Sequence, residues 1–285
     1  MFEGCTSLLD APPVLNCTSN SNNTYHSMFR NCTSLTGAME INNTSIGWSA
    51  CGSMYEGCTS LRTPPIWHFT GCANSYRSMF KNCWSLTAVP NISSMYNMTR
   101  WGGNADPQMS YMFENCVSLT SVPQNYLPWK FITYSVFQGM FYGCRNLTAA
   151  PDLPATGALL DRCYQNMFYG CSRLSTLHVS FDAWADNLNA TTNWLYGVAA
   201  SGILTMDTPL EDIRDDSHIP VGWNGGTPIA IPENALTIIG KRGISKIRIQ
   251  KINTPGEVDI WYSKNGGAAY QYSTFNTALT MVEGD

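Results

Sequence analysis

The chain has 285 residues, a formal net charge of −4, and 44% hydrophobic but only 13% charged residues. A chain of this length and apolar content can bury a core, and its weakly acidic balance gives no reason to expect nucleic acid as a partner. No apolar run approaches the roughly 20 residues that a transmembrane helix needs, so we expect no membrane span.

An eight-residue motif, M-F/Y-x-G/N-C-x-x-L, recurs from the first residue onward. It begins at Met1, Met28, Met54, Met79, Met112, Met140 and Met167, and a worn copy surrounds Trp194. The starts lie 25 to 28 residues apart, except for 33 between Met79 and Met112. Repeats of this period are typical of solenoids, in which a coil buries its apolar side chains only by stacking on its neighbours. We therefore expect about eight coils over residues 1–223.

The spacing within a repeat predicts one strand and one short helical turn per coil, with the strands stacked into a parallel sheet. The motif cysteine and leucine are expected to form the core ladder. These residues are Cys32, Cys58, Cys83, Cys116, Cys144, Cys171, Leu35, Leu61, Leu86, Leu119, Leu147 and Leu174. The Ser/Thr positions after the leucine are expected to face outward, either as a flat binding face or because β-propensity favours them on an exposed strand.

The long repeat carries an insertion, roughly 96–108, whose Gly, Asn, Asp and Pro residues predict a projecting loop. It contains Arg100 and Trp101, and Trp67 and Trp129 occupy the variable halves of neighbouring coils. Repeat architecture does not require tryptophan there, and aromatic residues in a polar setting suit sugar stacking or a protein contact. These four residues form the predicted ligand-binding patch. The alternative is that the tryptophans fill gaps between coils.

The eleven cysteines include no C-x-x-C pair. Because seven of them share one core position, buried free thiols are favoured over a metal or disulfide ladder. A disulfide at Cys17 or Cys72 stays open. The four histidines lie in different repeats, and no nucleophile, P-loop or dinucleotide motif is present. We therefore expect no catalytic residues, no metal and no cofactor.

The repeat pattern stops after Trp223. Residues 224–233 are interpreted as a linker, and 234–285 as a small antiparallel all-β module, because alternating apolar positions flank the turn dipeptide Asn265-Gly266.

The repeats resemble the BspA-type leucine-rich repeats of bacterial surface proteins. The resemblance rests on Leu153–Thr156, Cys163-Tyr164, Met167-Phe168, Gly170-Cys171 and the ending Ile219–Trp223, and it covers about residues 1–223. Met39 and His178 depart from it, since the pattern has proline at both positions.

The resemblance implies an extracellular or cell-surface protein that binds a protein or glycan on a cell surface. The alternative is a structural spacer or fibre segment of a surface or phage assembly. The first motif begins halfway through a repeat unit, so we expect a segment of a larger protein, with any signal peptide outside it.

Overall fold

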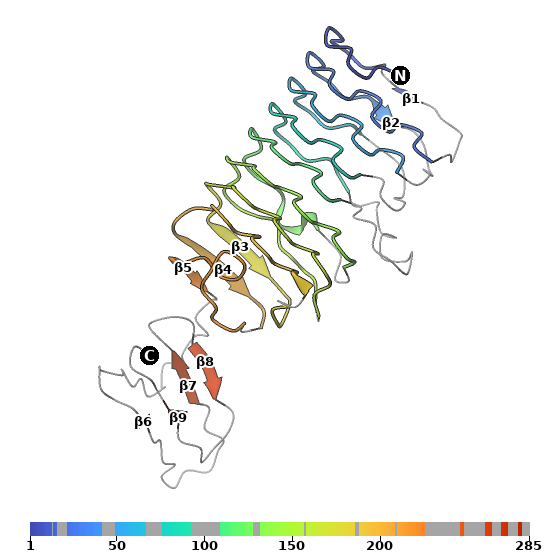
Figure 1. Cartoon of the computed structure of the whole chain (residues 1–285). Helices are drawn as coiled ribbons and strands as arrows, with labels where there is room; N and C mark the ends of the chain where they lie inside the picture. Colours follow the sequence, from blue (N-terminus) through green and yellow to red (C-terminus); the bar gives the residue numbers. More distant parts are fainter. Residues whose placement is uncertain are drawn as a thin grey trace.

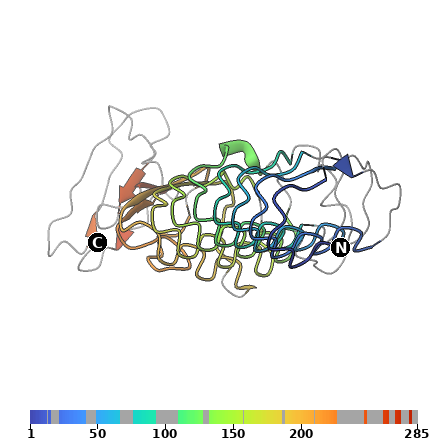
Figure 2. The same ribbon diagram turned by 90° about the horizontal axis from the view of Figure 1, so that it is seen from above.

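The computed structural model describes residues 1–12, 14–15, 22–41, 49–66, 76–92, 109–127, 132–156, 158–185, 188–208 and 210–225. Beyond them it describes only the strand segments 246–247, 260–263, 269–272 and 279–280. From residue 1 to 225 the chain winds into a row of coils stacked side by side, with the N-terminus at one end (Figure 1). Figure 2 shows the same row from above. The predicted solenoid is the architecture of this part of the chain.

The core consists of columns in which the same motif position repeats from coil to coil. The aromatic residue after the motif methionine forms one such column, with ring centroids 5.3 to 5.8 Å apart and nearly parallel planes. Its members are Phe2, Phe29, Tyr55, Phe80, Phe113, Phe141 and Phe168. All twelve cysteines and leucines of the expected ladder are fully buried, with exposed fractions of 0%. Stacking thus removes from water apolar surface that a single coil would expose.

Each motif forms a run of tight turns, so the predicted short helical turn is wrong. The backbone N–H groups of alternate residues donate within the same turn; for example, Cys32 N donates to Phe29 O at 3.0 Å. The N–H groups of the residues between them donate to the next coil; for example, Phe29 N donates to Met54 O at 2.9 Å. Every fourth residue has a positive φ, for example Ser27 at 53° and Asn31 at 60°. These residues interrupt helical geometry, and the described residues contain no α-helix; the 3-10 turn η1 (Gln124–Tyr126) is the one helical element described in full.

This geometry explains why the fourth motif residue is glycine or asparagine. That residue has a positive φ at Gly4, Asn31, Gly57, Asn82, Asn115, Gly143, Gly170 and Gly197. Glycine has no Cβ to clash there, and asparagine tolerates the left-handed region better than most residues. The G/N alternation in the sequence is therefore a backbone requirement.

Parallel pairing on the other side of each coil is interrupted. Extended pairing occurs between β1 (Val14–Leu15) and β2 (Glu40–Ile41), and among β3 (Thr176–Val179), β4 (Gly202–Met206) and β5 (Trp223–Gly225). Bridges such as Gly37 to Thr63 are isolated. Proline lacks the N–H that a ladder needs. The two positions where proline is replaced, Met39 and His178, lie next to β2 and inside β3, so both restored donors fall at or beside a regular strand.

Three tryptophans close the C-terminal end of the coil row, and each indole N–H donates to a backbone carbonyl at 2.8 Å. Trp184 donates to Glu211 O, Trp194 to His218 O, and Trp223 to Ala199 O. The His218 ring lies perpendicular to the Trp184 ring at 4.9 Å, and its Nδ1 is 2.8 Å from Asp215 Oδ1. The last coils thus end in a packed aromatic cluster.

Farther along the chain, two antiparallel strand pairs are described. β6 (Lys246–Ile247) pairs with β9 (Leu279–Thr280), and β7 (Ile260–Ser263) pairs with β8 (Ala269–Tyr272). Asn265-Gly266 and the other connecting segments lie outside the described residues. The module over 234–285 and the linker over 224–233 therefore remain predictions.

Candidate functional site

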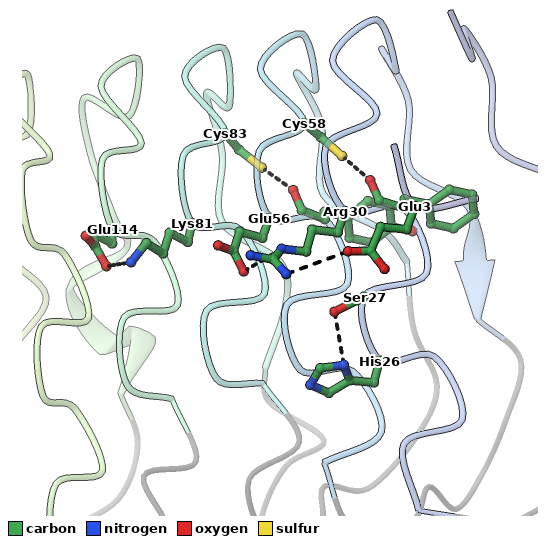
Figure 3. A network of polar contacts seen from close by, with 11 residues as sticks. Glu3, His26, Ser27, Arg30, Glu56, Cys58, Lys81, Cys83 and Glu114 are labelled. Carbon is green, nitrogen blue, oxygen red and sulfur yellow. Dashed lines mark hydrogen bonds and ion pairs between the residues drawn. The ribbon is translucent and has the colours of Figure 1, made fainter. Parts of the chain in front are cut away.

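The surface over the stacked turns, here called the turn face, carries the third motif residue of every coil. In the first five coils this residue is charged with alternating sign, in the order Glu3, Arg30, Glu56, Lys81 and Glu114. Figure 3 shows these side chains as a row across successive coils. Arg30 lies 3.6 Å from Glu3 and 3.4 Å from Glu56, and Lys81 lies 2.8 Å from Glu114. Each cation of this charged row is thus paired within the row, and the row as a whole keeps one excess negative charge.

The same position changes to tyrosine in the next three coils. Tyr142, Tyr169 and Tyr196 stack with ring centroids 4.7 Å apart in both steps. Tyr196 is 45% exposed, and the other two are partly exposed. These three residues are called the tyrosine row. The buried aromatic column one residue earlier fills the core without them, so packing does not require tyrosine on this surface.

A fourth tyrosine borders the row. Tyr111 has a φ of 57°, although bulky residues rarely adopt positive φ. Its ring covers Gly139, because a Cβ built on Gly139 would lie 2.3 Å from the ring atom Cε1. Lys81 Nζ lies 5.9 Å from the ring centroid. Since Tyr142 N donates to Gly139 O, Tyr111 sits on the turn in which the tyrosine row begins. A positive φ at a bulky residue is a strained backbone conformation, and such strain is often found at functional sites. At Tyr111 it occurs beside the partly exposed tyrosine row.

The outward Ser/Thr stripe beside the motif leucine has a structural use. Thr36, Thr87 and Thr148 are exposed, and each hydroxyl donates to a carbonyl of the preceding coil at 3.2 to 3.4 Å. Ser175 does the same to Thr148 O at 3.5 Å. These hydroxyls join neighbouring coils, which favours the structural interpretation of the stripe over the binding one.

From Cys32 onward, the motif cysteines form a column of buried thiols that are not activated as nucleophiles. Each thiol donates to the carbonyl oxygen of the aromatic residue one coil earlier, such as Cys58 Sγ to Phe29 O at 3.0 Å (Figure 3). Burial raises the pKa of Cys58 and Cys144 to about 12. The nine cysteines that are described are free. Within the described ranges, no group of three or more His, Cys, Asp or Glu residues is placed to hold a metal ion.

The predicted ligand-binding residues Trp67, Arg100, Trp101 and Trp129 lie outside the described residues, as do Cys17 and Cys72. Sequence reasoning missed the tyrosine row, although its signal was present: a motif position that alternates in charge becomes tyrosine three times running. It also missed Trp84, which is 54% exposed at a motif position where the preceding copies have threonine.

The coils are stacked, equivalent core residues form columns, and equivalent surface residues form rows. These features define a solenoid repeat scaffold. A family model described as "BspA type Leucine rich repeat region" matches residues 1–105 and 109–183 in six copies. The chain therefore belongs to the BspA-type leucine-rich repeat family. This family provides repeats of the binding or scaffold kind, and its members are commonly associated with cell surfaces.

A search of curated proteins finds no significant match to the chain. Over the described segments, no helix is both long enough and apolar enough to cross a membrane.

Proposed function

We propose that the chain is an extracellular or surface-exposed binding protein whose turn face contacts the partner through the tyrosine row. The observation that carries the proposal is the exposed stack of Tyr142, Tyr169 and Tyr196. Tyrosine combines a large apolar area with a polar hydroxyl and loses little conformational entropy on binding, which is why it is enriched in binding surfaces. The stack is already ordered by its own contacts, so little further ordering is needed when a partner binds.

The surface around the row supports this proposal. The charged row ends at Glu114, where Lys81 neutralises it. Next come Tyr111 and then the tyrosine row, so apolar and hydroxyl-bearing side chains extend over four successive coils. Contiguous aromatic side chains at a protein surface are typical of interaction sites. Trp67, Trp101, Trp129 and Arg100 remain proposed as an extension of the site, on the sequence argument alone.

A binding experiment with variants tests the proposal. The labelled chain is applied to a glycan and protein array, and the affinity of the strongest ligand is measured for Tyr169→Ser and Tyr196→Ser. We expect each variant to bind at least tenfold more weakly, which corresponds to about 1.4 kcal/mol. Tyr134→Ser is the matched control, because Tyr134 is 41% exposed and lies outside the row. Circular dichroism verifies that the variants are folded.

The proposal fails if the row variants bind as tightly as the unmodified chain. Weakening by Trp84→Ser alone would place the site in the coil that carries Trp84, away from the tyrosine row. If the array gives no ligand and sedimentation shows concentration-dependent self-association, the chain is instead a spacer or fibre segment of a surface assembly.

A further inference from the structure

Two exposed arginines lie beside the tyrosine row. Arg145 follows Tyr142 by three residues, and Arg173 follows Tyr169 by four, so each extends from the turn that carries the neighbouring tyrosine. The cations of the charged row are paired: Arg30 with Glu3 and Glu56, and Lys81 with Glu114. Among the described residues, neither Arg145 nor Arg173 has a carboxylate within ion-pair distance. Two guanidinium groups are therefore available on adjacent coils.

A strip of bare backbone separates the tyrosines from the arginines. It consists of Gly170 and Gly197, with φ values of 72° and 71°, while Gly143 in the same column lies beneath the Asn115 side chain. A Cβ on Gly170 would meet nothing closer than Gly143 Cα, at 3.9 Å, so the space above this residue is open. In the earlier coils asparagine side chains occupy part of the same column, as at Asn82 and Asn115, which bond to each other at 2.9 Å. The strip is thus clearest beside the tyrosine row.

The central hydroxyl of the row, that of Tyr169, is held in its protonated form. Burial, followed by the charges of Tyr142, Tyr196 and Asp216, raises the pKa of Tyr169 above its usual value. A neutral phenol both donates and accepts hydrogen bonds, whereas a guanidinium only donates and matches a carboxylate with two parallel N–H groups. The surface therefore presents aromatic rings, a phenol hydroxyl and two guanidinium groups on adjacent coils.

We propose that the tyrosine row, the glycine strip and Arg145 with Arg173 bind an acidic saccharide chain laid along the coil axis, an inference that rests on the proposed function. Carboxylates on successive sugar residues contact the two arginines. The sugar rings lie on the strip, with their C–H groups and hydroxyls against the tyrosines. An extended acidic peptide fits less well, because its same-side groups repeat at about 6.6 Å while the tyrosine rings repeat at 4.7 Å.

The test is calorimetric titration of the whole chain with an oligogalacturonate and with a neutral galactose oligomer of equal length. We expect the acidic oligomer to bind at least tenfold more tightly, and its affinity to fall as salt increases, because exposed charge pairs are screened. Arg145→Gln and Arg173→Gln should each weaken binding of the acidic oligomer about tenfold. Arg62→Gln, an equal change in net charge at an exposed arginine beside the motif leucine, should leave the affinity unchanged.

Three outcomes overturn the inference: equal binding of the acidic and neutral oligomers, no effect of the two arginine changes, or tighter binding of an oligo-aspartate peptide. If Tyr169→Ser still weakens binding of an array ligand in any of these cases, the proposed function stands and only the saccharide assignment fails. If Tyr169→Ser has no effect on any ligand, both proposals fail.

Discussion

At the scale of single residues, the motif cysteine acts as a hydrogen-bond donor as well as a small apolar side chain. The carbonyl of Phe80 accepts two bonds, from Cys83 N at 3.0 Å and from Cys116 Sγ at 3.2 Å. One bond closes the local turn, and the other joins adjacent coils. A valine of similar volume would pack but would leave the second lone pair of this buried carbonyl unused. The thiol therefore contributes to the contact between coils.

Replacement of one thiol measures this contribution. Cys116→Val should lower the free energy of unfolding by about 0.5–1.5 kcal/mol, the usual net value of one hydrogen bond. Cys116→Ala should cost more, because it also leaves a cavity. Urea unfolding followed by circular dichroism measures both. The reverse change offers a control: Val198 occupies the cysteine position in the worn coil, and Val198→Cys should not destabilise the chain. A Cys116→Val variant as stable as the unmodified chain would contradict the role of the thiol as donor.

The same thiols make stability depend on pH. Because burial raises the pKa of Cys144 to about 12, the folded chain holds this proton more tightly than the unfolded chain does. This contribution of Cys144 to the free energy of unfolding is complete below about pH 8.5, the pKa of a cysteine in the unfolded chain. It is lost as the pH rises toward 12. Under reducing conditions the free energy of unfolding should fall above about pH 9, by up to about 1.4 kcal/mol per pH unit for each buried thiol. Cys144→Val should make this fall less steep, and an unchanged slope would contradict the assignment.

At the scale of elements, the stacked turn replaces the helix as the unit beneath the turn face. The left-handed residues at the fourth motif position form one column, but the free space around them differs from coil to coil. A Cβ on Gly143 would lie 2.2 Å from Asn115 Oδ1, whereas a Cβ on Gly197 would come no closer than 3.6 Å to Gly170 Cα. Both glycines have a φ of 71°. The backbone requirement is thus equal, and only the steric one differs.

This pair separates the two effects. Gly197→Ala should cost about 1–2 kcal/mol, from the left-handed conformation alone. Gly143→Ala should cost more, because Asn115 must also move. Asn31→Gly should be nearly neutral, since glycine adopts the same φ freely. Thermal and urea unfolding of the three variants provides the comparison. Equal losses for the two alanine variants would show that Asn115 moves away without cost.

At the scale of the whole molecule, each coil is stabilised mainly by its two neighbours, so the closing contacts at the C-terminal end affect the last coils first. Gly202 makes these contacts possible, because a Cβ there would lie 2.5 Å from the Trp223 indole and 2.7 Å from Ser175 O. Trp223 is in turn anchored to Ala199 O.

Gly202→Ala should therefore displace Trp223 and lower hydrogen-exchange protection in the last coils, while the coils around Leu86 keep theirs. Exchange measured by mass spectrometry resolves the two regions. In the double variant Gly202→Ala/Trp223→Ala the two losses should not add, because residues in contact are coupled. A uniform loss of protection along the chain would mean that the coils unfold as one unit.

The sequence was sufficient for the solenoid and its family, because the recurring cysteine, leucine and aromatic positions can be buried together only by stacking. It was misleading about the turn, since apolar residues three positions apart suit a helical turn and a tight turn equally. The glycine or asparagine at the fourth motif position was the distinguishing signal. The tyrosine row was not predicted, because the third motif position faces solvent and packing of the core sets no requirement on it. The predicted Trp101 lies outside the described residues.

The hydrogen bonds that join the turns of adjacent coils run in one direction along the row. In the turns, amides such as Tyr25 N, Phe29 N and Asn31 N all donate to the following coil, while Thr36 N donates to the preceding one. In the parallel strands the two directions alternate, and their dipoles largely cancel. The turns therefore form aligned columns of peptide dipoles that point along the stacking axis, with their positive pole toward the coils that carry Tyr196. This is a longitudinal electrical polarity, set by the backbone, and it increases with every coil that is added.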